Sequence, residues 1–289
     1  MGTALAMPTV ADVLAATIRR LADAGVPEPR ADAELLVAHT LGTDRAGVIA
    51  AARRPLDVDA LARLDALARR RAAREPVFHL LGVREFWSLP IAVDARVLTP
   101  RPVTELLVET ACRVAPGARR VLDLGTGSGA VAAALATELP AARIVAADRS
   151  ADALAVAHGN LRRLAPAVVC VRGDWLAPFR PATFDLVVAN PPYVRDDELP
   201  TLAPEVRDAE PALALRGGVD GLDAYRAIVP QAACALAPGG WLAMEMGRGQ
   251  AREVAALIRA DGRFAAPALV RDGSDIERVV AVQRGDRWT

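Results

Sequence analysis

Residues 121–129 read Val121-Leu122-Asp123-Leu124-Gly125-Thr126-Gly127-Ser128-Gly129. This stretch predicts an apolar strand that ends in a glycine-rich loop, and Ala130 then opens a helix. Glycines let the backbone turn tightly and approach a ligand closely, and the first turn of a helix offers free N–H groups to that ligand. The stretch therefore indicates the repeating unit of an α/β sheet, with a ligand-binding loop at its centre.

Strands and helices alternate from residue 119 onward. The sequence predicts strands at 120–124, 143–147, 167–171, 184–189, 240–246 and 278–284. Helices are expected near 128–138, 151–163, 221–236 and 248–260, and one more near 103–114 precedes the first strand. This alternation is typical of a doubly wound parallel sheet. A further extended segment at 263–270 suggests an antiparallel hairpin at one edge of that sheet.

The first part of the chain has a different pattern. Apolar residues recur at helical spacing, which predicts three short helices at 9–24, 30–41 and 58–74. Residues 77–99 are instead mostly apolar at a period of two, which indicates a β-hairpin. We therefore expect a helical domain at 1–75, a linking hairpin at 76–98 and an α/β domain at 99–289.

Composition excludes several classes of protein. Lys+Arg and Asp+Glu number 35 each among 289 residues, so no overall charge favours nucleic acid or a membrane surface. The 3 cysteines and 3 histidines are dispersed along the chain, so neither a disulfide framework nor a metal site is expected. Signal-peptide and membrane-span patterns are also missing from the sequence. These observations favour a cytoplasmic protein, which we expect to act as a monomer.

A carboxylate follows the strand after the glycine loop. Ile144-Val145-Ala146-Ala147 ends in Asp148, whose side chain suits two ribose hydroxyls, and its distance from Gly125 fits the geometry of nucleotide sites. We expect a nucleotide-type ligand to be held by Gly125, Thr126, Gly127, Ser128, Gly129 and Asp148. Because the loop also matches the dinucleotide pattern G-x-G-x-x-A, these residues alone leave the identity of the ligand open.

Two more features follow the next strands. Asp174 could accept a hydrogen bond from an adenine amino group, and Trp175 could cover the adenine ring. The motif Asn190-Pro191-Pro192-Tyr193 ends the strand at 184–189, because two prolines remove two backbone donors. It leaves the Asn190 side chain, two carbonyls and the Tyr193 ring at the edge of the sheet. Such a group can hold a planar NH2 by its two hydrogens.

All four features lie at the carboxyl ends of strands, where an open α/β sheet binds its ligands. Together they indicate S-adenosylmethionine with an amine or amide methyl acceptor. Three alternatives remain. One is an N6-adenine methyltransferase acting on nucleic acid, which the balanced charge disfavours. The others are a nicotinamide oxidoreductase, which does not need the Asn-Pro-Pro-Tyr motif, and a non-catalytic cofactor-binding protein.

Several longer motifs accompany these sites. They are Gly82-Val83-Arg84-Glu85-Phe86-Trp87, Pro100-Arg101-Pro102, Thr104 to Glu109, Glu210-Pro211, Gly217-Gly218-x-Asp220-Gly221 and Pro238-Gly239-Gly240. With them, nearly the whole chain resembles the peptide chain release factor N5-glutamine methyltransferases, the PrmC/HemK family. The chain departs from the family pattern at Val103 and Ala209, so a divergent paralogue that methylates another protein or a small-molecule amide is a further alternative.

The resemblance implies a Rossmann-like class I methyltransferase sheet, a small N-terminal helical domain and S-adenosylmethionine as cofactor. The implied substrate is the glutamine in the Gly-Gly-Gln loop of class I release factors, which the helical domain helps to receive. The resemblance also implies that Asn190 Oδ1 and the Pro191 carbonyl accept the two N–H bonds of the glutamine amide. Pro192 and Tyr193 complete the substrate site, with the Tyr193 ring against the amide plane.

Overall fold

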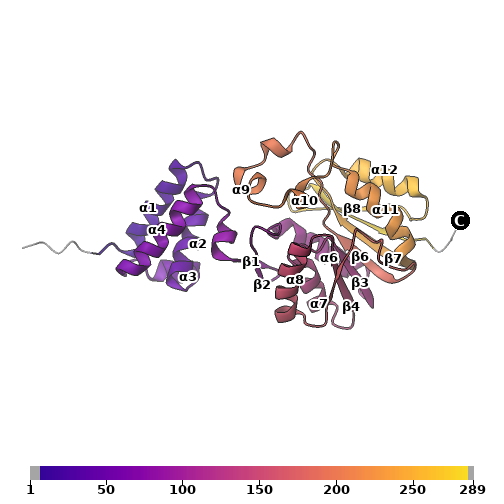
Figure 1. The fold of residues 1–289 in the computed structure, drawn as a ribbon, viewed down its shortest axis with the longest axis horizontal. Coiled ribbons are helices and arrows are strands. Elements are labelled where there is room, and N and C mark those ends of the chain that lie inside the picture. The colour runs from indigo at the N-terminus through magenta and orange to yellow at the C-terminus, as the bar shows by residue number, and fades with distance from the viewer. Residues whose placement is uncertain (1–6, 286–289) are drawn as a thin grey trace, which may run out of the picture. The chain divides into compact units, whose positions relative to one another are not determined.

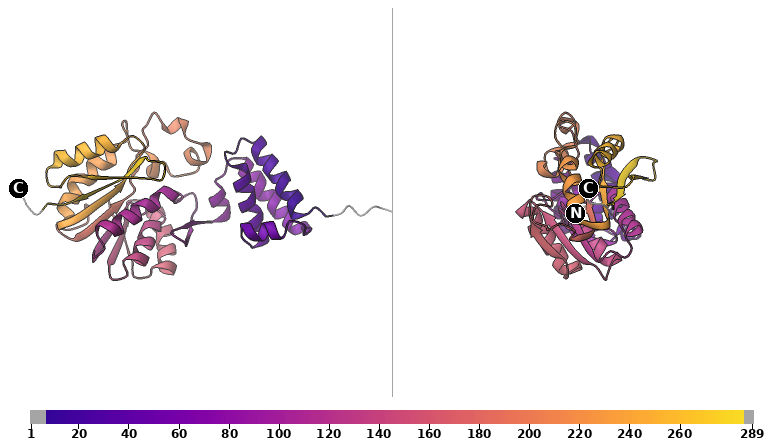
Figure 2. Two further views of the ribbon diagram at one scale, coloured as in Figure 1. Left: turned by 180° about the vertical axis from the view of Figure 1, so that it is seen from behind. Right: turned by 90° about the vertical axis from the view of Figure 1, so that its right-hand side faces the viewer.

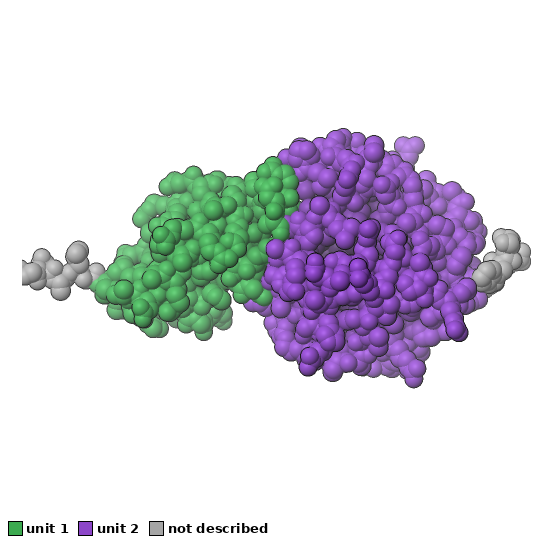
Figure 3. All heavy atoms as spheres, viewed as in Figure 1, with its two compact units in different colours: residues 1–82, 204–209 green, residues 83–203, 210–289 purple. Residues whose placement is uncertain are grey.

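The computed structural model describes residues 7–285, which form two compact units (Figures 1 and 3). Unit 1 comprises the chain up to Gly82 together with Pro204–Ala209, and unit 2 comprises Val83–Ala203 and the residues from Glu210 onward. The outer ends of the domains predicted at 1–75 and 99–289 lie outside the described residues.

Unit 1 is helical. Its helices are α1 (Val10–Asp23), α2 (Pro29–Leu41), α3 (Arg45–Ala50), α4 (Val58–Ala72), α5 (Val77–Leu81) and the short α9 (Pro204–Arg207). The Thr9 side chain caps α1 and Asp12 returns the bond, while Gly42 ends α2 in the left-handed conformation. The three predicted helices are present.

Helices α3 and α5 correct the sequence-based prediction. Helix α3 has only 6 residues, too few to show a period, and it begins because the Asp44 side chain accepts the Gly47 N–H bond. Helix α5 occupies Val77–Leu81, which the sequence analysis assigned to the linking hairpin. Its five residues are mostly apolar and resemble a strand, but Gly82 adopts the left-handed conformation that ends a helix.

A buried ion cluster joins α9 to the other helices of unit 1. Arg71 of α4 is only 3% exposed. It donates from Nε to Asp32 of α2 at 2.7 Å and from Nη2 to Glu205 of α9 at 3.1 Å. Arg74 also donates to Glu205, at 3.1 Å from its Nε. Because a buried guanidinium is costly unless it is paired, these contacts hold the segment Pro204–Ala209 in unit 1.

Unit 2 is built on a seven-stranded sheet of order β5-β4-β3-β6-β7-β9-β8. Its strands are β3 (Arg120–Leu124), β4 (Arg143–Asp148), β5 (Val169–Arg172), β6 (Phe184–Ala189), β7 (Leu236–Glu245), β8 (Ala268–Arg271) and β9 (Glu277–Gln283). Strands β3 to β7 are parallel, and β9 runs antiparallel to both β7 and β8. The predicted α/β fold is confirmed, including the antiparallel hairpin at one edge.

Helices cover both faces of this sheet (Figures 1 and 2). One layer holds α6 (Glu105–Val114), α7 (Ala130–Glu138) and α8 (Ala151–Leu164), and the other holds α11 (Asp223–Ala235) and α12 (Ala251–Asp261). Two layers arise because crossovers are right-handed and the order β3-β4-β5 runs in the opposite direction from β6-β7. Leu122, Val187 and Leu242 of the sheet pack against Tyr225 and Ile228 of α11.

The hairpin predicted before the sheet is also present. Strands β1 (Val83–Phe86) and β2 (Leu89–Ala92) pair antiparallel, and Trp87 and Ser88 form a tight turn with φ angles of 53° and 58°. Between β6 and α11 the chain forms a 3-10 turn (Leu199–Thr201) and helix α10 (Ala212–Leu215). No helix within residues 7–285 is both long and apolar enough to cross a membrane.

Candidate active site

The carboxyl ends of the central strands lie in one row. Leu124 of β3 pairs with both Ala147 of β4 and Ala189 of β6. The residues that follow therefore leave the sheet side by side: Gly125, Asp148 and Asn190. The chain turns from β3 toward β4 on one side and from β6 toward β7 on the other. This reversal creates the crevice in which open α/β sheets bind ligands.

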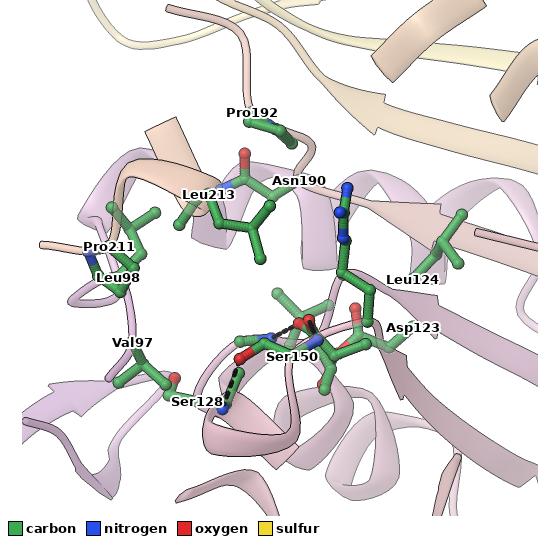
Figure 4. Close-up of a pocket in the computed structure, with 18 of the residues that line it drawn as sticks. Val97, Leu98, Asp123, Leu124, Ser128, Ser150, Asn190, Pro192, Pro211 and Leu213 are labelled. Carbon is green, nitrogen blue, oxygen red and sulfur yellow. Dashed lines mark hydrogen bonds between the residues drawn. The ribbon is translucent and has the colours of Figure 1, made fainter. Parts of the chain in front are cut away.

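A cavity of about 360 Å³ lies at this edge of the sheet (Figure 4). Ser128 and Ser150 lie on one side of the cavity, and Asn190 and Pro192 lie on the opposite side. The volume falls within the range of about 300–1,000 Å³ that small-molecule sites occupy. The glycine loop and the Asn-Pro-Pro-Tyr motif thus border the same space.

The glycine loop takes a conformation that other residues rarely adopt. Gly125, Gly127 and Gly129 have φ angles of 72°, 54° and 81°. The Asp148 carboxylate closes the loop, because Oδ2 accepts the Gly127 N–H bond at 3.0 Å and Oδ1 accepts the Ser150 N–H bond at 2.9 Å. Asp148 therefore shapes the loop as well as facing the cavity.

Asp123 supports this loop from beneath. Its side chain is 2% exposed, and Oδ2 accepts hydrogen bonds from the Thr126 hydroxyl at 2.5 Å and the Ala132 N–H group at 3.1 Å. Burial raises the pKa of Asp123 to about 7, although these two hydrogen bonds oppose the rise. The carboxyl group ties the loop to the first turn of α7.

Asn160 of α8 ties the loop to the hairpin. Its side chain is buried and donates from Nδ2 to the carbonyls of Ser128 and Ala92, both at 2.9 Å. Its Oδ1 accepts the Ala92 N–H bond at 2.8 Å. Sequence reasoning missed this residue, because an asparagine within a helix gives no signal until its distant partners are known.

Asn190 is held with a defined orientation. Its Nδ2 donates to Thr104 Oγ1 at 3.1 Å. Since a primary amide has one donating and one accepting end, this bond directs Oδ1 away from Thr104. The side chain is half-buried and borders the cavity. It can therefore present an acceptor to a ligand.

Tyr193 is fixed at both its side chain and its backbone. Its hydroxyl donates to Glu245 Oε1 at 3.3 Å, and its carbonyl accepts from Gln250 Nε2 at 3.0 Å. Burial raises the pKa of Tyr193, and the neighbouring Glu245 charge adds to this rise. The hydroxyl therefore stays protonated and acts as a donor at neutral pH.

Most of the predicted site residues border the cavity: Gly125, Thr126, Gly127, Ser128, Asp148, Trp175, Asn190 and Pro192. Gly129, also predicted, is buried and is not part of the lining. The structure places Asp174 outside this lining, with an exposed side chain. Pro191 is buried and Tyr193 is half-buried, and neither is part of the lining.

Glu210 is a further buried carboxylate beside the cavity. Its Oε2 accepts from Arg101 Nη2 at 2.5 Å, and its Oε1 accepts from the Thr99 N–H group at 3.2 Å. Arg101 and Pro211 line the cavity, so Glu210 fixes two segments of its wall. Desolvation raises the pKa of Glu210, while the Arg101 charge opposes that change.

Comparison with known proteins covers both units. Residues 12–82 match the PrmC N-terminal domain, and residues 102–219 match the methyltransferase small domain. A release factor glutamine methyltransferase from Geobacter sulfurreducens is 43% identical over 277 residues, covering 96% of this chain and 97% of the relative. The chain belongs to the release factor glutamine methyltransferase family.

A second member of the family, from Cereibacter sphaeroides, is 44% identical over 275 residues and covers 94% of this chain and 98% of its own length. A solved methyltransferase from Pyrococcus furiosus shares the fold with a TM-score of 0.51 at 20% identity, over 68% of this chain and 89% of that one. The family resemblance and the Rossmann-like methyltransferase fold predicted from the sequence are confirmed.

Proposed function

We propose that this methyltransferase transfers a methyl group from S-adenosylmethionine to the side-chain amide nitrogen, N5, of the glutamine in the Gly-Gly-Gln loop of class I release factors. One observation carries the proposal: the glycine loop and Asp148 border the same cavity as Asn190. The proposed donor site and the proposed amide-holding group thus border one space. Family membership supports the reaction class and the glutamine acceptor.

The residues of the cavity fit S-adenosylmethionine. An added Cβ at Gly125 or Gly127 would meet nothing within 4 Å, so the loop leaves open space where a ligand can approach its backbone. The Asp148 carboxylate can accept from two ribose hydroxyls, and Trp175 offers an apolar wall for the adenine. When bound, S-adenosylmethionine supplies an electrophilic methyl group on a positively charged sulfur.

The chain must compensate for a poor nucleophile, because the lone pair of an amide nitrogen is delocalised into its carbonyl. We propose that Asn190 Oδ1 and the Pro191 carbonyl accept the two N–H bonds of the glutamine and hold its nitrogen in line with the methyl group. Tyr193 would pack against the amide plane. Such positioning can contribute roughly 7–11 kcal/mol in favourable cases. The two acceptors also stabilise the positive charge that develops on nitrogen.

The proposed role of Asn190 predicts different effects on methyl transfer and on cofactor binding. Asn190→Ala should abolish methyl transfer, because the acceptor amide loses one of its two hydrogen-bond partners. Binding of S-adenosylhomocysteine, measured by calorimetry, should be retained, because the glycine loop and Asp148 are unchanged. Loss of cofactor affinity with normal turnover would contradict the role of Asn190.

The test is incubation with labelled S-adenosylmethionine and a purified class I release factor. A release factor with Gln→Ala in its Gly-Gly-Gln loop is the control, and we expect label on the wild-type factor only. Label on nucleic acid would favour an N6-adenine methyltransferase and overturn the proposal. Label on another protein or a small amide would identify a divergent paralogue. The balanced charge of the chain supports a protein partner, and a cytoplasmic monomer stays a prediction.

A further inference from the structure

We infer that Glu245 is a positioning residue that fixes the orientation of the Asn190 amide through Thr104, so that Oδ1 and not the NH2 group faces the acceptor. The inference rests on the proposed function, because it assigns a cause to the acceptor geometry of Asn190. Three residues are involved. Glu245 ends β7, Thr104 lies in the turn before α6, and Asn190 follows β6.

Glu245 stands in the same row as the other site residues. Met244 of β7 pairs with Ala189 of β6, so Glu245 and Asn190 leave these two strands together. The Glu245 side chain is 1% exposed, and its Oε1 accepts the Tyr193 hydroxyl. Within residues 7–285, its buried Oε2 has no hydrogen-bond partner of standard geometry. A buried carboxylate is costly without donors, so this oxygen requires one.

We assign that donor to the Thr104 hydroxyl. It is the last residue of the 3-10 turn Pro102–Thr104, and its buried hydroxyl oxygen accepts from Asn190 Nδ2 at 3.1 Å. Burial raises the pKa of Glu245, while hydrogen bonding by the Thr104 and Tyr193 hydroxyls lowers it. A hydroxyl has a single proton, and we assign that proton to Glu245.

The carboxylate sets the direction of every bond in the chain of contacts. An ionised carboxylate can only accept, so Thr104 donates to it and keeps a lone pair for Asn190 Nδ2. The remaining end of the Asn190 amide is Oδ1, which can then accept from the substrate NH2. Positive charge from Arg278 and Arg101 also favours the ionised form of Glu245. Glu245 thus acts on both Asn190 and Tyr193, the first and last residues of the motif.

Glu245→Gln should reverse this order. The one oxygen of glutamine would accept the Tyr193 hydroxyl, and its NH2 group would face Thr104. Thr104 would then donate to Asn190, and the Asn190 amide would turn its NH2 group toward the substrate NH2. Two donors cannot bond to each other, so the acceptor glutamine would be misplaced. We expect kcat to fall about 100-fold, as for a misplacement of about 1 Å.

The test compares Glu245→Gln, Thr104→Val and Thr104→Ser in the complete chain with a purified release factor. Thr104→Val removes the hydroxyl at nearly constant volume and should lower kcat about as much as Glu245→Gln. Thr104→Ser keeps the hydroxyl and should restore kcat to within a few-fold of the wild type. Because the two residues act in series, the double variant should be no slower than Thr104→Val alone. Affinity for S-adenosylhomocysteine should not change.

A second readout needs no acceptor. The side-chain NH2 resonances of Asn190 should shift in both Glu245→Gln and Thr104→Val, and should return in Thr104→Ser. Asp185→Asn is the matched control, because Asp185 lies at the opposite end of β6 and accepts the Arg119 and Arg120 N–H bonds at 3.0 and 2.9 Å. It should leave both kcat and these resonances unchanged.

The inference fails if Glu245→Gln keeps wild-type kcat, if Thr104→Ser is as slow as Thr104→Val, or if the two single effects multiply in the double variant. Thermal unfolding of each variant shows whether a lower kcat comes from loss of the fold or from loss of positioning. The variants Thr104→Val and Thr104→Ser test the inference without altering the buried carboxylate of Glu245. Failure of the wild-type protein to label the Gly-Gly-Gln loop would instead count against the proposed function. The Asn190 resonances would still decide the orientation of its amide.

Discussion

Gly217 packs against the backbone of Tyr193, and we predict that Gly217→Ala slows methyl transfer without weakening cofactor binding. A Cβ built on Gly217 lies 2.8 Å from both the Cα and the carbonyl carbon of Tyr193. Carbon atoms are in favourable contact at about 3.5–4.0 Å, so one of the two segments must move by about 0.7 Å or more. The φ angle of Gly217 is not positive, and the effect is therefore steric.

Hydrogen bonds direct this displacement to the site. Gly217 donates its N–H to the Val194 carbonyl at 2.7 Å, and the Tyr193 carbonyl accepts from Gln250 at 3.0 Å. The Val194 N–H group also donates to the Leu215 carbonyl at 2.9 Å, so the two segments are joined by two backbone bonds and cannot simply separate. Overpacking of this kind costs about 1–3 kcal/mol of stability. A shift of about 1 Å at the motif should lower kcat about 100-fold.

The assay measures initial rates with labelled methyl donor and saturating release factor, together with calorimetry of S-adenosylhomocysteine. Gly159→Ala is the matched control, because a Cβ at this position of α8 meets nothing within 4 Å. We expect Gly159→Ala to keep the wild-type rate. A Gly217→Ala enzyme with unchanged kcat, or with lost cofactor affinity and normal kcat, would refute the reasoning.

Three further predictions follow from the site and from unit 1. Asp148→Ala should raise the dissociation constant of S-adenosylhomocysteine about 100-fold in calorimetry, because the carboxylate bonds the loop as well as the proposed ribose; an unchanged constant would refute that assignment. Asp123 keeps its proton in the folded protein up to about pH 7, whereas the unfolded chain releases it near pH 4. The free energy of unfolding should therefore fall as the pH rises between these values, by up to about 1.4 kcal/mol per pH unit. Asp123→Asn should remove that slope in urea unfolding, and an equal slope in both proteins would show that another group is responsible. Glu205→Ala should destabilise unit 1 by about 3 kcal/mol, because the buried Arg71 loses one of its two carboxylate partners. The loss should appear as faster amide hydrogen exchange in α2 and α4. Unchanged exchange would mean that the ion cluster adds no stability.

The sequence predicted those parts of the fold that glycine and proline delimit. Strands β3 and β6 begin and end as expected, because the glycine loop follows one and two prolines follow the other. Strand β7 begins at Leu236, four residues before its predicted start. Pro238-Gly239-Gly240 resembles a loop, yet Leu236 pairs with Phe184 through an irregularity in the ladder. Only the partner strand reveals that the pairing continues.

The site could be predicted only where its chemistry is local in the sequence. The glycine loop, Asp148 and Asn190 each follow a recognisable strand, and the register of the sheet then brings them together. Thr104 and Asn190 are 86 positions apart, so no local period indicates their hydrogen bond. Asn160 depends in the same way on Ala92, 68 positions earlier. Such contacts follow from the packing of whole elements.

The membership of Pro204–Ala209 in unit 1 affects how the protein can be divided into fragments. A fragment that begins at Val83 would keep every strand and the cavity but would lose Arg71 and Arg74, the two cations that pair with Glu205. A fragment that ends at Gly82 would leave the buried Arg71 without Glu205. A chimera that exchanges helical domains between relatives would therefore have to carry two pieces of sequence, the chain up to Gly82 and the matching residues 204–209.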